Sequence, residues 1–394
     1  SVNANIVFPS IHYEAESATD FTGIPVQGSK SGKITKTTIA PHIYGAYKAS
    51  DDVTLGLGVY VPFGSATEYE KDSVLRHNIN KLGLTTIAIE PVVAWKLNDR
   101  HSFGAGIIAQ HTSAELRKYA DWGIQQKAKA KASGKPDAAI AAAIQADGHA
   151  DVKGHDWGFG YQLAWMWDIN DRARVGVNYR SKVSHTLKGT ADWEADGADA
   201  KRAWDLITKL GYVPNEKASV KIVTPESLSV HGMYRATDKT NLFGDVTWTR
   251  HSRFNKAELV FENTKNVVNG KSDRTVITPN WRNTYKVAFG GSYQVTEPLQ
   301  LRAGIAFDKS PVKSAEDRMN SLPDGNRIWF SVGAKYQLGK NHVIDAAYSH
   351  IHINDTVYRT GKASGNDVDS RGASSARFKN KADILGLQYT YKFK

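Results

Sequence analysis

The residues of this sequence best suited to binding a ligand are basic side chains that share the polar face of a predicted strand, at a spacing of two residues. Lys118 lies at even spacing from Gln110 and Thr112, so in a strand all three would point to the same polar face. A cation in a poorly solvated site binds a carboxylate through charge-assisted hydrogen bonds. The alternative is that such a residue pairs with a carboxylate of the protein itself. Further basic residues with polar-face spacing are Arg180, Lys182, Arg302, Arg327 and Lys335.

Catalytic and metal-binding chemistry find little support in the sequence. The chain has no cysteine, which excludes a thiolate nucleophile and any cysteine-ligated metal. His350 and His352 share one strand face, a spacing that two metal ligands could adopt, but no third ligand accompanies them. Serine and histidine are plentiful, yet no motif places a serine–histidine pair with an orienting group. We therefore predict a protein that is not an enzyme and has neither a cofactor nor a metal site.

The composition narrows the class of protein. The chain has 394 residues and a formal net charge of +11, which favours anionic partners. No basic helix or recognition motif accompanies that charge, so nucleic acid is not an expected partner. The mean hydropathy is −0.45, and no run approaches the ~20 apolar residues of a spanning helix. A membrane β-barrel is compatible with both observations, because only alternate residues of its strands face lipid.

Long alternating segments dominate the sequence. In the stretch "DWGFGYQLAWMWDIND", aromatic and aliphatic residues occupy one face, and glycine and polar residues occupy most of the other. The pattern recurs in residues 102–118, 172–183, 285–289, 299–307, 328–338 and 385–393. Many of these segments have roughly ten or more residues, whereas an ordinary strand has about five or six. The soluble alternative, a sandwich or propeller, does not need strands of that length.

The connections between these segments alternate in length. Short polar turns are predicted at 49–52, 97–100, 169–172, 236–239, 295–298 and 338–341. Long, polar, irregular segments are predicted at 65–81, 119–155, 191–217, 262–280, 313–326 and 361–376. Short turns at one end and long loops at the other are typical of outer-membrane barrels. We predict an all-β, transmembrane antiparallel β-barrel of about fourteen strands, with both termini in the periplasm and short helices in the long extracellular loops.

Several segments resemble the FadL family, outer-membrane transporters of long-chain fatty acids and related hydrophobic compounds. The matching stretches are "FGSATEY", "DWGFGYQLAW", "VNYRSKV", "LKG", "LRAGIAFDKSPV" and "PDGNRIWFSVGAKY". They occur in the family order along nearly the whole chain. The resemblance implies a barrel of about fourteen strands, in agreement with the pattern of strands and turns.

The resemblance also implies a plug at the N-terminus, the hatch, which carries an Asn-Pro-Ala motif. This sequence has neither, and its first residues, "SVNANIVFPSIHYEA", resemble the first barrel strand. We therefore expect residues 1–394 to form a single barrel domain without the hatch. The chain is expected to be a monomer in contact with outer-membrane lipids and lipopolysaccharide.

The loops at 119–155 and 191–217 carry apolar residues at helical spacing. The first has two isoleucines four residues apart after a Pro-Asp pair suited to a helix start. The second has a tryptophan, an isoleucine and a leucine at steps of three residues. Either these residues pack the loops onto each other, or they leave an apolar groove for a ligand. The resemblance favours a groove that captures the ligand, formed by Trp122, Ile140, Ile144, Trp204, Ile207 and Leu210.

The resemblance assigns a basic residue to the ligand. Lys118 resembles in position a family arginine that meets the ligand carboxylate, so it is the predicted anchor, with Arg117 beside it. A second basic residue of the family precedes the segment "NWRNTYKVAFG". This chain has no basic residue at that point, where Arg274 and Arg282 are neighbours, and Arg282 is the candidate.

The stretch "LGLGVYVPFGSATEY" begins with the alternation of a strand, which a proline and a glycine then interrupt. Pro62 removes a ladder hydrogen bond, and a glycine such as Gly64 is typical of a bulge or bend. Either the strand ends at Pro62, or the break is a built opening whose backbone is satisfied in another way. The resemblance favours the opening, because the segment matches one beside an inward kink where the wall opens sideways. Pro62, Phe63 and Gly64 are the predicted kink residues.

The predicted function is passive uptake of hydrophobic molecules across the outer membrane, with long-chain fatty acids favoured. No nucleotide-binding loop is present in the sequence to argue otherwise. The resemblance does not separate fatty acids from aromatic hydrocarbons, since relatives carry either. Two other classes stay open: a diffusion porin for small polar solutes, and an outer-membrane lipid hydrolase or acyltransferase.

Overall fold

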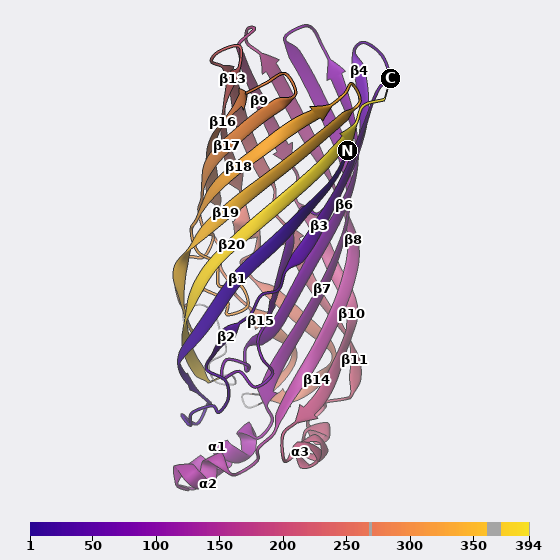
Figure 1. Ribbon diagram of the computed structural model, residues 1–394. Coiled ribbons are helices and arrows are strands. Elements are labelled where there is room, and N and C mark those ends of the chain that lie inside the picture. The colour runs from indigo at the N-terminus through magenta and orange to yellow at the C-terminus, as the bar shows by residue number, and fades with distance from the viewer. Residues whose placement is uncertain (268–269, 361–371, 394) are drawn as a thin grey trace.

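The computed structural model describes residues 1–267, 270–360 and 372–393, which form a closed antiparallel barrel (Figure 1). Fourteen strands make the wall, which closes where β20 (Ala373–Tyr391) pairs with β1 (Val2–Thr19). The predicted fold class is therefore confirmed. Among the described residues, no helix is long and apolar enough to span a membrane.

The wall contains continuous and interrupted strands. The continuous ones are β1, β3 (Thr38–Lys48), β6 (Ile79–Lys96), β7 (His101–Asp121), β8 (Asp147–Asp168), β17 (Leu299–Asp308), β18 (Arg327–Leu338), β19 (His342–Arg359) and β20. The interrupted ones are β4 (Val53–Tyr60) with β5 (Gly64–Glu68), β9 (Ala173–Arg180) with β10 (Val183–Asp196), β11 (Asn215–Thr224) with β12 (Ser227–Arg235), β13 (Thr240–Thr249) with β14 (Ala257–Val267), and β15 (Gly270–Ile277) with β16 (Thr284–Gln294). A short strand, β2 (Ser31–Lys33), pairs with the outer part of β1.

Side chains alternate between a lipid-facing surface and the lumen. On β7, Ile107 is 65% exposed, whereas Ile108 is fully buried. Two neighbours of the same type differ in this way because successive strand residues point to opposite faces. Phe159, Tyr161 and Leu163 continue the exposed apolar face on the adjacent strand β8. This apolar band is the surface that faces lipid in a barrel of this kind.

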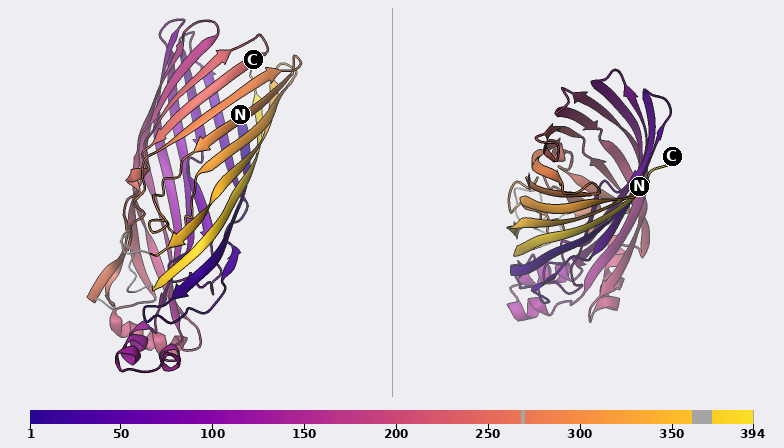
Figure 2. Two further views of the ribbon diagram at one scale, coloured as in Figure 1. Left: turned by 90° about the vertical axis from the view of Figure 1, so that its left-hand side faces the viewer. Right: turned by 45° about the horizontal axis from the view of Figure 1, so that its top comes forward.

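The two ends of the barrel differ (Figures 1 and 2). Tight turns join the strands at one end, and both chain termini lie near it. The other end carries the helices α1 (Ile124–Ala132), α2 (Asp137–Ala141) and α3 (Ala200–Ile207), with the single turn η1 (Thr208–Leu210) after α3. Outer-membrane barrels place their long loops outside the cell, so the end with the helices is the extracellular one.

The strands extend further outwards than the sequence predicts. β7 and β8 leave only 122–146 between them, and β10 and β11 leave only 197–214, so the two helix-bearing loops are shorter than expected. The prediction of an irregular segment at 262–280 was wrong for most of its length, because β14 and β15 form a hairpin there. Polar residues on both faces hid its alternation. Residues 361–371 of the last predicted loop lie outside the described residues.

The predicted loop helices are present. α2 begins directly after Pro136, whose fixed φ suits a helix start and whose missing N–H needs no partner. It ends at Ala141, so Ile144 lies beyond it. α3 contains Trp204 and Ile207.

Candidate ligand-binding site

A cavity of about 580 Å³ occupies the outer half of the lumen. Its walls come from facing sides of the barrel, including β6, β7, β11 and β14, and they are mainly apolar. A volume of this size falls within the range of ~300–1,000 Å³ that is usual for small-molecule sites. Apolar lining residues include Leu82, Leu84, Leu116, Val152, Val220 and Leu259, and polar ones include His251, Asp308, Asp324 and Arg327.

The segment between β17 and β18 crosses the lumen and forms one wall of this cavity. Tyr69 and Thr67 reach it from the opposite side of the barrel and donate to the carbonyl oxygens of Asn320 and Ser321 at 2.6 and 2.7 Å. Asn320 in turn donates its side-chain N–H to the carbonyl oxygen of Ile79 at 2.9 Å. Residues 313–326 were predicted as a long irregular segment at the outer end of the barrel, and they do join the outer ends of β17 and β18, but they fold into the lumen. Polar composition is shared by outer loops and by segments that fill a polar lumen, so it could not separate them.

The third strand of the wall breaks where the sequence predicts. β3 and β4 pair as far as Ile43 and Val59, and beyond that point β5 forms its ladder with β6 and, among the described residues, none with β3. The two sides meet again where the N–H of Glu68 donates to the carbonyl oxygen of Ile34 at 2.8 Å. The strand resumes after the break, so Pro62 is not its outer end. The ladder of the wall is open between these two contacts.

The backbone at the break is hydrogen-bonded by another route. The N–H of Phe63 donates to Thr86 Oγ1 at 2.9 Å, and the N–H of Thr86 donates to the carbonyl oxygen of Phe63 at 3.1 Å. Thr86 is fully buried, and Pro62 has no N–H to satisfy. An open ladder is tolerated at membrane depth only when the freed groups find such partners. Pro62, Phe63 and Gly64 all line the cavity, which therefore reaches the gap in the wall.

A layer of hydrogen-bonded polar side chains from β4, β6, β7, β9 and β10 lies on the periplasmic side of the cavity. The Tyr60 hydroxyl donates to Glu90 at 2.9 Å, and the Arg180 guanidinium lies over the Tyr60 ring, 5.3 Å from its centroid. Gln110 is fully buried and its Nε2 lies 2.9 Å from Nε2 of His185. Arg180 therefore faces the lumen as predicted, and it is engaged by groups of the protein itself.

Two of the other basic residues with polar-face spacing pair with carboxylates of the protein itself. Arg302 lies 2.9 Å from Asp345, and Arg327 pairs with Asp324 beside the cavity. Lys182 lies in the interruption between β9 and β10 and is exposed.

Lys118 points into the lumen on the outer side of the cavity. It shares the face of β7 with Ala114 and Leu116, which line the cavity, and Leu116 is the lining residue next to it. Its Nζ lies 3.3 Å from Thr275 Oγ1 of β15, across the lumen. The position of Lys118 would allow it to meet the polar end of a ligand whose apolar part extends past Leu116.

The two arginines predicted with Lys118 lie elsewhere. Arg117 is its neighbour on β7 and therefore points to the other side of the strand, where it is buried and donates to Asn80 Oδ1 at 2.7 Å. Arg282 is partly buried and donates to the carbonyl oxygen of Ser310 at 3.3 Å. Neither arginine lines the cavity.

The apolar residues predicted in the two long loops form one cluster beneath the helices, except for Ile140. Trp122, Ile144 and Ile207 are buried together, and the rings of Trp122 and Trp204 lie 5.5 Å apart. Leu210 packs at its margin, whereas Ile140 is buried on α2 outside the cluster. These side chains are packed against one another in this conformation, and none of the six lines the cavity. A capture groove at this place stays a prediction.

A second apolar cluster connects the helix cluster with the cavity. Trp193 packs against both clusters, and its ring lies 5.4 Å from that of Phe261. Val152 and Leu259 belong to the second cluster and also line the cavity. Apolar side chains thus continue from the helices to the cavity, and from there to Phe63 at the break.

A buried ion pair that was not among the residues predicted from the sequence lies beside this path. Lys265 Nζ lies 2.8 Å from Glu216 Oε1, and the two residues are 4% and 2% exposed. The ammonium also faces the rings of Phe261, Trp193 and Tyr212, at 4.6, 5.4 and 5.6 Å from their centroids. Burial and, secondly, the Glu216 charge raise the pKa of Tyr212 to about 12. The partners come from β11 and β14, and no local pattern links the two residues.

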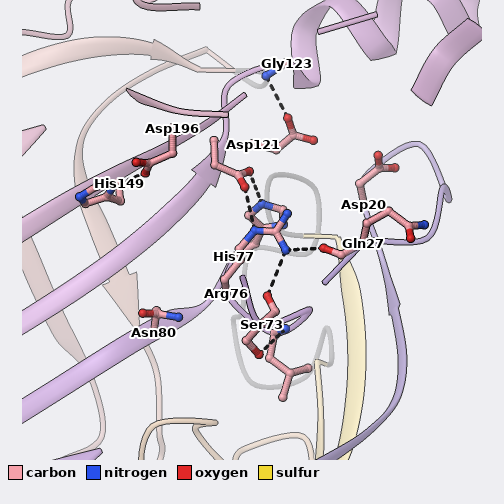
Figure 3. A network of polar contacts seen from close by, with 12 residues as sticks. Asp20, Gln27, Ser73, Arg76, His77, Asn80, Asp121, Gly123, His149 and Asp196 are labelled. Carbon is pink, nitrogen blue, oxygen red and sulfur yellow. Dashed lines mark hydrogen bonds and ion pairs between the residues drawn. The ribbon is translucent and has the colours of Figure 1, made fainter. Parts of the chain in front are cut away.

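A polar network lies over the outer mouth, where residues 69–78 cross it. Arg76 and His77 both contact the Asp147 carboxylate, at 2.7 Å each. Arg76 also donates to the carbonyl oxygens of Gln27 and Ser73 at 2.8 and 3.1 Å (Figure 3). Burial alone would raise the pKa of the Asp147 carboxyl, but the hydrogen bonds and charges of His77 and Arg76 outweigh it and lower the pKa to about 2.

Comparison with known proteins places this barrel in a family. The family model described as "Outer membrane protein transport protein (OMPP1/FadL/TodX)" matches residues 1–393. The chain belongs to this family. It is therefore an outer-membrane protein of the FadL/TodX group, a family of transport channels for hydrophobic compounds rather than of enzymes.

Relatives of this FadL/TodX member are found in several Gram-negative bacteria. An outer membrane protein of Neisseria meningitidis serogroup B is 81% identical over 100% of this chain and 85% of its own length. A long-chain fatty acid transport protein of Escherichia coli is 25% identical, over 100% of this chain and 84% of its own length. Among solved structures, a Pseudomonas aeruginosa FadL homologue superposes with a TM-score of 0.85 at 24% identity, covering 100% of this chain and 90% of that one. That likeness confirms the fold.

Proposed function

We propose that this chain is a passive channel that takes up hydrophobic molecules at its extracellular loops and releases them sideways into the membrane. Long-chain fatty acids are the favoured substrates. The observation that carries the proposal is the series of apolar contacts from the helix cluster, through Trp193 and Leu259, to Phe63 at the break. A path of this shape suits an extended apolar ligand, because burying each methylene is worth ~0.8 kcal/mol.

Lys118 is the proposed anchor for the carboxylate of such a ligand. It stands at the outer side of the cavity, two residues beyond the lining residue Leu116, and its ammonium lies near the hydroxyl of Thr275. A carboxylate held there leaves the acyl chain to extend along the apolar wall. An aromatic hydrocarbon has no charge for Lys118 to bind, and for this reason we favour a fatty acid.

Sideways release is supported by the contrast between the two exits of the cavity. Along the barrel axis, a ligand moving towards the periplasm would pass the polar layer of Tyr60, Glu90 and Gln110. Beyond it lies a second cavity of about 520 Å³, whose mostly apolar lining includes three charged residues, Arg174, Asp245 and Lys286. At the break, Phe63 and Gly64 line the first cavity, and the lipid-facing Ile39 and Ile43 of β3 border the gap. An acyl chain leaving there avoids both the polar layer and water.

A retention assay tests the proposal. The purified full chain is incubated with palmitic acid, toluene and glucose at equal concentrations, and the retained molecules are counted by mass spectrometry after rapid gel filtration. We expect palmitic acid to be retained near one molecule per chain, and Leu116→Gln to reduce that retention. Ser113→Gln, on the exposed outward face of the same strand, is the matched control and should have no effect.

The same assay separates the other functions. Preferential retention of toluene would assign the chain to aromatic hydrocarbons. Retention of none of the three, together with free passage of glucose through reconstituted vesicles, would identify a diffusion porin and contradict the proposal. Release of fatty acid from a phospholipid added in a parallel incubation would instead indicate a hydrolase.

A further inference from the structure

Basic residues gather on the outward face of four neighbouring strands, at the outer edge of the lipid-facing band. They are Lys33 on β2, His12 on β1, Lys379 and Lys381 on β20, and His352 on β19, and all are exposed. We call these five residues the basic patch. Their direction is fixed by their strand neighbours: Tyr13 and Phe378 are buried inside the barrel, at 1% and 0% exposure.

The strand register aligns the members of the basic patch in two rows. Lys33 lies directly opposite His12, and His12 lies directly opposite Lys379. Two residues further along β20, Lys381 lies directly opposite His352. Basic side chains that face each other across strands repel when charged, so their pairing is destabilising unless an anion lies between them.

The described residues supply little negative charge to this patch. Among the described residues, Lys33, Lys379 and Lys381 take part in no ion pair within 4 Å. Two carboxylates nearby are engaged by other groups: Glu16 pairs with Arg377, and Asp383 accepts hydrogen bonds from Tyr348 and His350 while its charge also acts on Lys381. Glu14 lies in the next row outwards, directly opposite Arg377.

The patch lies at the level of the outer-leaflet headgroups. Towards the periplasm, the same outward face carries Phe8 on β1, with Leu385 and Leu387 on β20, all of which are exposed to lipid. A strand needs about 9–11 residues to cross the membrane. β1 has covered that length when it reaches His12, so the patch begins where the hydrocarbon ends.

We propose that the basic patch binds the phosphate groups of a phosphorylated glycolipid in the outer leaflet. Adjacent strands lie ~4.8 Å apart, so the backbones at Lys33 and Lys379 are about 10 Å apart and both ammonium groups can reach one phosphate between them. A phosphate accepts several charge-assisted hydrogen bonds at once. The acyl chains of the same lipid lie along Phe8, Leu385 and Leu387, which a free phosphate ion cannot use.

Native mass spectrometry of the full chain in detergent tests this site, with diphosphorylated lipid A and its dephosphorylated form as probes. The wild type should retain the phosphorylated form in preference to the dephosphorylated one. Each lysine near an anionic lipid is worth about fivefold in affinity, so Lys379→Gln with Lys381→Gln should weaken retention about 25-fold. The control pair, Lys340→Gln with Lys392→Gln at the periplasmic end, removes the same charge and should change nothing.

Three results would overturn the proposal. Equal retention of both lipid A forms by the wild type would show that phosphate is not recognised, and this comparison needs no variant to fold. Full displacement by inorganic phosphate at the same concentration would identify an anion site that does not use the lipid. A dimer mass that the Lys379 and Lys381 substitutions abolish would assign the patch to a second copy of the chain.

Discussion

Replacing Lys265 by methionine should loosen the outer mouth of the barrel. The ammonium and the Glu216 carboxylate are 2.8 Å apart and almost fully buried, and Glu216 Oε2 has no hydrogen-bond partner within the described part of the chain. Methionine retains most of the side-chain volume but leaves the carboxylate unpaired, which costs about 3–5 kcal/mol in a buried site. Changing both residues, to Lys265→Met with Glu216→Gln, removes the unpaired charge and should recover most of that loss.

Hydrogen exchange of the backbone at the outer ends of β11 and β14 is the assay, because the perturbation acts locally. A loss of 3–5 kcal/mol speeds exchange by roughly two to four orders of magnitude at amides protected by this contact. The double variant should return to within about tenfold of the wild type. Two results would refute this reasoning. Either the effects of Lys265→Met and Glu216→Gln on the exchange free energies simply add in the double variant, or the Lys265 variant exchanges as slowly as the wild type, and in both cases the pair is not a coupled buried unit.

Two other predictions concern charged groups. Lys118→Ala should weaken binding of palmitic acid more than of methyl palmitate, by about 1.5–3 kcal/mol in a displacement titration, because only the acid offers a charge. Lys335→Ala in the periplasmic half is the control, and equal losses for both ligands would mean that Lys118 acts through packing. The fold lowers the pKa of the Asp147 carboxyl from 3.8 to about 2. Its ionised form therefore stabilises the folded outer mouth by about 2 kcal/mol, and this stabilisation is complete above pH ~4 and is lost as the pH falls towards 2. Cleavage of residues 69–78 by pepsin should therefore rise over that interval in the wild type, and Asp147→Asn should show fast cleavage throughout; an unchanged wild-type rate would contradict this.

Much of the fold could be predicted because its signal is local. Strand alternation needs only neighbouring residues, as the contrast between Ile107 and Ile108 shows. The break at Pro62 could also be predicted, because a proline in a strand removes a ladder hydrogen bond. Thr86, which satisfies the backbone of Phe63, carries no such sign, because a threonine in a strand is ordinary until its partner is known.

The parts that could not be predicted depend on contacts between distant segments. Residues 313–326 read as an outer loop, but Tyr69 and Asn320 hold the segment inside the barrel through bonds across the lumen. Arg117 and Lys118 were grouped as neighbours in sequence, although neighbours on a strand point to opposite sides. The pair of Glu216 and Lys265 depends on how β11 and β14 are placed, which composition and periodicity do not encode.

The most direct test of sideways release is to restore the strand at the break. Pro62→Val with Gly64→Val gives the third strand a backbone N–H at every residue, so that it could pair with β3 without a break. A Cβ added at Gly64 meets nothing closer than 3.8 Å, so the barrel should fold. The measurement is uptake of labelled palmitate by cells that carry the variant, with binding of palmitate to the purified variant measured alongside. We predict that uptake is lost while binding is kept. Normal uptake by the folded double variant would contradict the account, because the ligand would then leave by another route.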